Sequence, residues 1–256
     1  LVLGLGGIGK TPAREWSDEI RMTHAGEQLL RWVDGIADSG NRIRTLCNYT
    51  HAPVPEGFES DVQPVYQVFD FQGQALTDPV YLGVVADYRD GIAEGHSIAL
   101  GQDDEAYILW SVRPSHQHYL TIIDSSGAVV DTMIQLQGIN TYNYQIRPYL
   151  FVDSNGDLII VKCLSSNRQL FYARYHSNGE MVDSIRFIGG EDQFVAHLYA
   201  TLDPGDTLHV AYQENINFDI VHFRYSKITP DDEFITEDLS IDEVDGNRDV
   251  GITGIA

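Results

Sequence analysis

Lysine is scarce in this chain of 256 residues, which carries 16 basic and 38 acidic side chains and a formal charge of −22. The lysines are Lys10, Lys162 and Lys227. Nucleic acids and anionic lipid surfaces attract proteins through basic patches, so this balance argues against both kinds of partner. Apolar residues still make up 43% of the chain, which is enough for a folded core.

Long apolar runs and cysteines are also rare. The sequence contains no stretch of about 18 apolar residues, so we expect no transmembrane helix. The two cysteines, Cys47 and Cys163, stand at matching places in two units of the repeat described next. Equivalent positions two units apart lie beyond the roughly 7 Å Cα separation that a disulfide tolerates, so we interpret both as buried thiols.

A fourfold repeat organises the sequence. Each unit has an apolar run, a turn rich in Asp, Asn, Ser and Gly, two further strands, a second turn and a last strand. The units span about residues 29–84, 95–136, 147–188 and 194–241. Alternating apolar and polar residues indicate half-buried strands, and Asn-Gly or Asp-Gly pairs supply the positive-φ residues that hairpin turns need.

Four strands per unit, at a period of about 50 residues, predict an all-β fold: a β-propeller of four-stranded antiparallel blades. Strand signals at residues 16–23 and 249–256 predict a partial fifth blade beside the four recognisable ones. We therefore expect residues 16–256 to form the propeller and residues 1–15 to be a leader or linker. Counting seven residues from each first turn assigns Cys47, Trp110, Cys163 and Tyr212 to one equivalent slot.

The blocks "DSNGDLIIVKC…QLFYARYHSNGEMVDSIRF" and "DSGNRIRTLCNY…VYQVFDFQGQALTDPVYL" resemble the sialidase-like (BNR-type) repeat propellers of secreted microbial proteins. The resemblance covers roughly residues 16–256. It implies the propeller fold but not one activity, because one fold hosts many functions. The chain departs from the sialidase Asp-box: Asp124-Ser125-Ser126-Gly127 and Ser177-Asn178-Gly179 match only part of it, and no Trp follows.

One short motif points to a nucleotide and is set aside. Residues 4–11 match the phosphate-binding loop pattern G-x-x-x-x-G-K-[ST]. Such a loop needs a buried strand before it and a helix after it, whereas three residues precede this one and Pro12 follows it. We interpret the segment as a glycine-rich leader.

Acidic clusters are the candidates for a metal site. Asp245, Asn247 and Asp249 alternate oxygen ligands as calcium prefers, and Asp153, Asn155 and Asp157 share that spacing. For the second cluster we favour a hairpin turn. The pair His116 and His118 has a chelating spacing, but its place between two strands favours a solvated loop. We expect no cofactor, with calcium as the alternative.

The long connections of a propeller share one face, called here the long-loop face, and the tight turns share the other. We expect a ligand site on the long-loop face, where aromatic, basic and acidic side chains suit a glycan or a protein. The candidate residues are Tyr88, Arg89, Asp90, His96, Tyr142, Tyr144 and Arg147. Asn48 begins an N-glycosylation sequon, Asn48-Tyr49-Thr50.

The leading functional hypothesis is a non-catalytic extracellular propeller, secreted or at the cell surface, that acts as a binding or structural module in a larger assembly. Its partner would be a protein or glycan on the long-loop face, and open propeller edges would allow self-association. Two alternatives stay open: a sialidase-like carbohydrate-active enzyme, and a subunit of an extracellular filament.

Overall fold

The structure is a computed structural model, and it describes residues 30–50, 62–82, 93–112, 117–139, 147–163, 169–188, 195–216 and 220–245. The regular elements of these residues are sixteen β-strands in four sheets, each built from four consecutive strands. Blade 1 contains β1 (Leu30–Ala37), β2 (Ile43–Thr50), β3 (Val62–Phe69) and β4 (Val80–Tyr81). Blade 2 contains β5 (Ala93–Leu100), β6 (Ala106–Val112), β7 (Gln117–Ile123) and β8 (Val129–Gln135). Blade 3 contains β9 (Tyr149–Val152), β10 (Leu158–Cys163), β11 (Leu170–Tyr175) and β12 (Arg186–Ile188). Blade 4 contains β13 (Val195–Leu202), β14 (Leu208–Ile216), β15 (Ile220–Ile228) and β16 (Phe234–Asp245).

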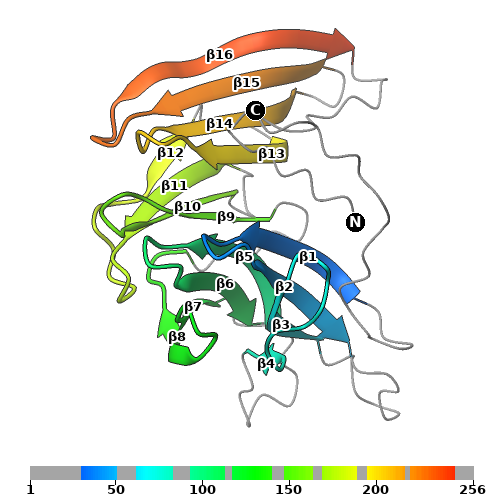
Figure 1. Cartoon of the computed structure of the whole chain (residues 1–256). Coiled ribbons are helices and arrows are strands. Elements are labelled where there is room, and N and C mark those ends of the chain that lie inside the picture. The colour runs from blue at the N-terminus through cyan, green and yellow to red at the C-terminus, as the bar shows by residue number, and fades with distance from the viewer. Residues whose placement is uncertain are drawn as a thin grey trace, which may run out of the picture.

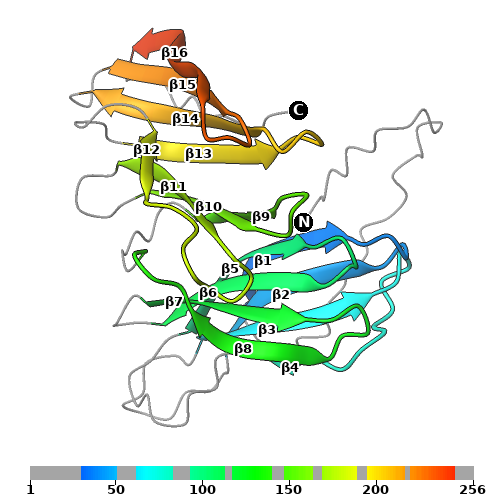
Figure 2. The same cartoon turned by 90° about the vertical axis from the view of Figure 1, so that its left-hand side faces the viewer.

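Each blade is an antiparallel meander, in which every strand pairs with the next one along the chain. The first strands pack in order, β1 against β5, β5 against β9, and β9 against β13, so they are the innermost strands of the four blades. Figures 1 and 2 show blades 1 and 2 together in the lower half, blade 3 above them and blade 4 at the top. The all-β propeller fold is therefore confirmed, while the segments of the expected fifth blade, 16–23 and 249–256, lie outside the described residues.

Three hydrophobic clusters fill the spaces between successive blades. Trp110 and Tyr66 lie in the cluster between blades 1 and 2, and Phe171 lies between blades 2 and 3. Tyr172 lies in the cluster between blades 3 and 4. Both faces of β6 and β10 are buried throughout, because a blade in the middle of the row packs against a neighbour on each side. Burial of apolar area between blades is thus the main source of stability.

Eight tight turns among the described residues share one geometry. In each, the N–H of the first residue donates to the carbonyl of the fifth, and the N–H of the fourth donates back to the first. The fourth residue always has a positive φ, which Gly, Asn and Asp tolerate best. The run Asp153–Asp157 is one of these turns, and Asp153 Oδ1 accepts hydrogen bonds from the N–H groups of Asn155 and Asp157. The hairpin interpretation of this acidic run is confirmed.

Contacts between turns tie neighbouring blades together. The N–H of Ser39 in blade 1 donates to Asp104 Oδ1 in blade 2 at 3.0 Å. The N–H of Ser154 in blade 3 donates to Asp206 Oδ1 in blade 4 at the same distance. The aspartates of the turns therefore serve as local turn formers and as acceptors between blades, which explains why so many acidic residues stand in the repeat.

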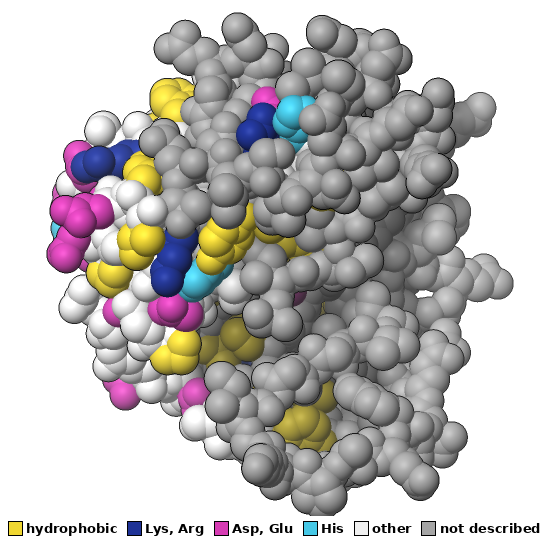
Figure 3. Space-filling model, turned by 90° about the horizontal axis from the view of Figure 1, so that it is seen from above, with side chains coloured by type: hydrophobic (Ala, Val, Ile, Leu, Met, Phe, Trp, Pro, Cys, Tyr) yellow, Lys and Arg dark blue, Asp and Glu magenta, His cyan; other side chains and the backbone are white. Residues whose placement is uncertain are grey.

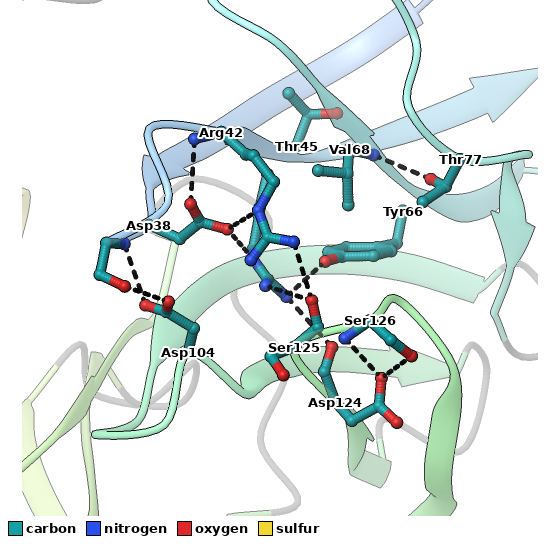
Figure 4. A network of polar contacts seen from close by, with 12 residues as sticks. Asp38, Arg42, Thr45, Tyr66, Val68, Thr77, Asp104, Asp124, Ser125 and Ser126 are labelled. Atoms are coloured by element: carbon teal, nitrogen blue, oxygen red, sulfur yellow. Dashed lines mark hydrogen bonds and ion pairs between the residues drawn. The ribbon is translucent and has the colours of Figure 1, made fainter.

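A buried arginine makes the strongest polar tie between blades 1 and 2 (Figure 4). The Arg44 side chain is fully buried, and its Nε donates to Asp38 Oδ2 at 2.9 Å. Its other nitrogens donate to Tyr66 Oη and to the carbonyls of Asp124 and Ser125, which belong to the outer turn of blade 2. In blade 3, Arg174 makes the corresponding tie by bonding Asp153 of its own blade and Asp232 of blade 4.

Neither cysteine forms a disulfide, and both are buried, as the sequence analysis expected. Burial raises the pKa of the Cys47 thiol to about 11, and Cys163 is fully buried. A thiol-directed alkylating reagent at neutral pH should therefore leave both cysteines unmodified in the native protein and modify both in denaturant. Intact-mass measurement distinguishes these states, and rapid native labelling of either cysteine would contradict this burial.

Candidate functional site

The innermost strands place four equivalent side chains around the propeller axis, which we call the axial ring. Each of these residues pairs with the same position of the second strand of its own blade. The partners in blades 1 to 4 are Leu46, Leu109, Val161 and Ala211. The members of the axial ring are Asp34, Ser97, Tyr149 and Tyr199. Because the inner strands pack against one another, one residue from each blade meets the others at the same depth.

Contacts within the axial ring join different blades. Asp34 Oδ2 accepts the N–H of Ile98 at 3.0 Å, and its carboxylate also interacts with the Ser97 hydroxyl. The Ser97 hydroxyl in turn accepts the N–H of Leu150 at 3.3 Å. Tyr149 donates to the carbonyl of Leu198 at 3.0 Å. Hydrogen bonds of the axial ring therefore link blade 1 to blade 2, blade 2 to blade 3, and blade 3 to blade 4.

Asp34 of the axial ring lies near the opposite charge of Arg147, which is not itself a member of the ring. Burial raises the pKa of Asp34, although the N–H of Ile98 and the charge of Arg147 oppose that shift. Burial lowers the pKa of Arg147, and the charge of Asp34 opposes it. Burial also raises the pKa of Tyr149 to about 12. Asp34 and Arg147 are both partly exposed.

A β-bulge directs His96 toward the next strand. The pairing of β5 with β6 shifts between Gly95 and Ser97, so His96 is the extra residue of the bulge. The inner strands of blades 1 and 4 have the same bulge, so it belongs to the repeat, and it redirects one side chain out of the regular alternation. His96 Nε2 lies 2.7 Å from Ser111 Oγ, and its ring stacks on His118 with centroids 5.6 Å apart. His96 itself is partly exposed.

Lys162 occupies a position that is apolar in the other three blades. It stands nine residues after the first turn residue of its blade, as do Cys47, Trp110 and Tyr212 in theirs. The assignment of Cys163 to this slot was wrong by one residue. The count of seven residues began at Gly156, which is the fourth residue of its turn, whereas Gly40 and Gly205 are the third residues of theirs.

Lys162 and His118 form a buried pair across the interface of blades 2 and 3. Lys162 Nζ lies 2.7 Å from His118 Nε2, and each residue is only 2% exposed. Burial lowers the pKa of Lys162 to about 7. The expectation of a solvated loop was wrong for His118, which lies in β7, while His116 lies outside the described residues.

We use the name polar centre for two sets of contacts that adjoin at the neighbouring residues His96 and Ser97 of β5. One set is Asp34 with Arg147, and the other is His96 with Ser111, His118 and Lys162. Among the residues predicted to bind a ligand, His96 and Arg147 belong to it. The others, Tyr88, Arg89, Asp90, Tyr142 and Tyr144, lie outside the described residues. The polar centre stands at the long-loop end of the strands, since Ser111 and His118 flank the connection between β6 and β7 and Lys162 precedes that between β10 and β11.

Two other predicted sites lie apart from the polar centre. Asn247, Asp249 and the side chain of Asp245 lie outside the described residues, and the described part of the chain holds no group of three or more His, Cys, Asp or Glu residues placed to bind a metal ion. Asn48 is 1% exposed, and its amide donates to the carbonyl of Gly95 and accepts the N–H of Gly95. The sequon asparagine thus faces the interior and joins blades 1 and 2. Among the described residues no helix is long and apolar enough to cross a membrane.

Comparison with known proteins shows similarity of fold without similarity of sequence. No protein-family model matches the chain, and a search of curated proteins finds no match. A protein of unknown function from Dyadobacter fermentans has a TM-score of 0.56 at 8% identity, over 83% of this chain and 69% of its own. An ulvan lyase bound to –[GlcA(1-4)Rha3S]– has a TM-score of 0.54 at 13% identity, over 84% and 56%. An exo-β-1,3-galactanase from Clostridium thermocellum has a TM-score of 0.52 at 9% identity, over 83% and 48%.

These solved structures support the propeller fold, and two of the three are named as enzymes that act on polysaccharides. At such low identity the similarity extends to the fold alone. The chain spans about half the length of the galactanase and the lyase. The sialidase-type resemblance therefore stays a prediction at the level of family.

Proposed function

We propose that this protein is a carbohydrate-active enzyme whose catalytic site is the polar centre. The observation that carries the proposal is Lys162, a lysine buried in a slot that is apolar in the other three blades and paired there with His118. Burying an ionisable group lowers stability unless charge pairing and hydrogen bonds compensate for the lost hydration. A function that needs the group is a reason for the protein to keep it there. Ionisable groups with strongly shifted pKa values gather at functional sites.

The groups of the polar centre match what acid–base catalysis requires. General acids and bases work best when their pKa lies near the working pH, and the pKa of Lys162 is lowered to about 7. His96 is partly exposed and stacks on His118, so it links the buried pair to a ligand at the axis. A non-catalytic module would gain stability from an apolar residue at position 162. This contrast favours the enzyme over the binding-module and filament hypotheses.

The named activities of the structural neighbours support a polysaccharide as the substrate class. One neighbour is an exo-β-1,3-galactanase and another an ulvan lyase. A polymeric sugar also suits a site at the open end of a propeller, where a chain can lie across the axis. The proposal extends to the class of substrate and not to the linkage.

The test measures turnover on a panel of polysaccharides, with the release of reducing ends as the readout. His96→Ala should lower kcat at least about a hundredfold, because it removes the acid–base group that reaches the substrate. His176→Ala is the matched control, since His176 is exposed in the outer turn of blade 3 and pairs with Asp157. Its activity should stay within about twofold of the parent. Binding of a glycan with no turnover, unchanged by either substitution, would establish a binding module instead.

A further inference from the structure

We propose that residues 16–23 and 249–256 form a fifth blade that packs on blade 4, with residues 249–256 as its inner strand. Such a blade completes the propeller, and it does not depend on the proposed activity. Two observations support it: each described blade bonds the next one by the same rule, and blade 4 carries the same groups on the face where a next blade would lie.

Each described blade bonds the following blade through its member of the axial ring. Asp34, Ser97 and Tyr149 each form a hydrogen bond with the backbone of the blade that follows. The partners are, in order, the N–H of Ile98, the N–H of Leu150 and the carbonyl of Leu198. The side chain at this position thus lies on the face that packs against the following blade. Tyr199 is the fourth member, so the same rule directs it away from blade 3.

Blade 4 has one face toward blade 3 and an opposite face, called here the outward face. Leu198, Val210 and Tyr212 belong to the hydrophobic cluster between blades 3 and 4. Side chains alternate along a strand, so their direct neighbours lie on the outward face. Its described members, which pair across β13, β14 and β15, are Tyr199, Thr201, His209, Ala211, Tyr225 and Lys227. Figure 3 views the molecule from the side of blade 4 and shows hydrophobic side chains there beside a basic residue and a histidine.

Blades 1 and 3 each bury a polar cluster under the blade that follows. In blade 1, Arg44 bonds Asp38 and Tyr66, and it also reaches the outer turn of blade 2. In blade 3, Arg174 and the corresponding tyrosine, Tyr172, bond the outer turn of blade 4. These two arginines and two tyrosines are at most 8% exposed, because the following blade covers them.

The corresponding cluster of blade 4 lies on the outward face. His209 stands six residues after Asp203, the first residue of its turn, as Arg44 stands six residues after Asp38. His209 Nε2 lies 3.1 Å from Asp203 Oδ2, and His209 Nδ1 lies 2.5 Å from Tyr225 Oη. This is the arrangement of carboxylate, nitrogen side chain and phenol that blade 1 places against blade 2. Blade 4 is therefore equipped for a following blade.

The faces at the two ends of the row are buried, although no described blade packs on them. On the outward face of blade 4, Ala211 is 6% exposed. On the face of blade 1 that is turned away from blade 2, Cys47 is 7% exposed and Phe69 is 3% exposed. None of these residues belongs to the hydrophobic clusters between described blades. Burial of both faces within a single chain favours an occupant from the same chain over a second copy.

Residues 249–256 and 16–23 stand where the repeat requires an inner and an outer strand. Each inner strand follows the outer strand of the blade before it, and residues 249–256 follow β16. Six residues, 24–29, separate residue 23 from β1, and six residues, 189–194, separate β12 from β13. The chain thus offers an inner strand after blade 4 and an outer strand before blade 1, which together make one blade.

Hydrogen–deuterium exchange of the full chain, read by mass spectrometry on peptides, tests the fifth blade without any substrate. In the parent protein, amides of residues 16–23 and 249–256 should exchange at least about a hundredfold more slowly than in an unstructured chain, because strand pairing protects them. Ile252→Pro removes a backbone donor from the proposed inner strand. Residues 16–23, at the other end of the sequence, should then lose at least about tenfold of their protection. Peptides from β6 report whether the described blades stay folded.

Ala211→Glu tests the outward face of blade 4. A glutamate side chain does not fit under a packed strand, so both segments should lose at least about tenfold of their protection. Val130→Glu is the matched control, because Val130 is 63% exposed in the outer strand of blade 2. It should change the exchange of both segments by less than about twofold.

Exchange of both segments at the rate of an unstructured chain overturns the fifth blade. Continued protection of residues 16–23 in Ile252→Pro overturns the shared sheet, and unchanged protection in Ala211→Glu overturns packing on the outward face. Should Ala211→Glu also unfold β6, Ile252→Pro decides. Protection that falls on dilution, together with dissociation of a dimer, assigns the face to a second copy and overturns the proposal. None of these results bears on the carbohydrate-active enzyme, whose test is turnover.

Discussion

Replacing Arg44 by methionine is expected to lower the free energy of unfolding by about 3 kcal/mol or more. The side chains of Arg44 and Asp38 are both fully buried and lie 2.9 Å apart. Burial by itself would raise the pKa of Asp38, yet the N–H of Arg42 and the guanidinium of Arg44 outweigh it and the pKa is lowered. Removing Arg44 takes a cation from a buried carboxylate and leaves Tyr66 Oη without that donor. Urea denaturation at neutral pH measures the loss.

Arg42→Met provides the matched control for that variant. Arg42 Nε bonds the same oxygen of Asp38 at 2.7 Å, but its side chain is 32% exposed. Exposed ion pairs contribute little, so this substitution should cost less than about 1 kcal/mol. Equal losses in the two variants would show that burial of Arg44 and its bonds to the blade 2 turn add nothing to the stability of the propeller.

The local features of the fold could be predicted from sequence because they depend on local chemistry. The turn at Asp124 shows why: Asp124 Oδ1 accepts the N–H groups of Ser126 and Ala128, and Gly127 has a φ of 93°. Those residue types form such a turn wherever they stand. The second and third strands were also predicted well, because central strands buried on both faces are dense in apolar residues.

The outermost strands were predicted less well. The repeat predicted a last strand at the end of the units 29–84 and 147–188, and the structure has only the short strands β4 (Val80–Tyr81) and β12 (Arg186–Ile188) there. Isolated bridges at Ala75 and Met181 mark where pairing begins and is then interrupted. An outer strand has one partner and an exposed face, so less packing holds it in register. Its extent therefore depends less on the β-propensity of its residues.

The polar centre could not be derived from sequence because it forms between blades. In the sequence, Lys162 falls within a pattern typical of a buried strand. Its equivalence to Trp110 is seen only when the turns are aligned by their hydrogen bonds. His118 looks like a loop residue until β7 is seen to begin at Gln117. Asp34 carries no motif at all. His96 and Arg147 were chosen as ligand-site candidates because aromatic and basic residues near long connections are a general sign of such a site, and their role stays a prediction.

Replacing Lys162 by methionine should stabilise the protein at neutral pH and abolish its activity. The pKa of Lys162 is about 7 in the folded protein and near its ordinary value of 10.5 in the unfolded chain. Between these values the unfolded chain holds the extra proton, so raising the pH favours folding. The parent protein should therefore gain about 2 kcal/mol of stability between pH 7 and pH 9 from this group, and Lys162→Met should not.

The comparison is made by urea denaturation at several pH values up to about 9, below the range in which buried tyrosines such as Tyr149 titrate. Methionine fills a similar volume without a charge, so the variant should be more stable than the parent, and this advantage should be about 2 kcal/mol larger at pH 7 than at pH 9. Parallel stability curves would show that Lys162 keeps an ordinary pKa in the fold. A stable, folded and inactive variant would instead show that blade 3 retains a lysine at the expense of stability, which a purely structural repeat has no reason to do.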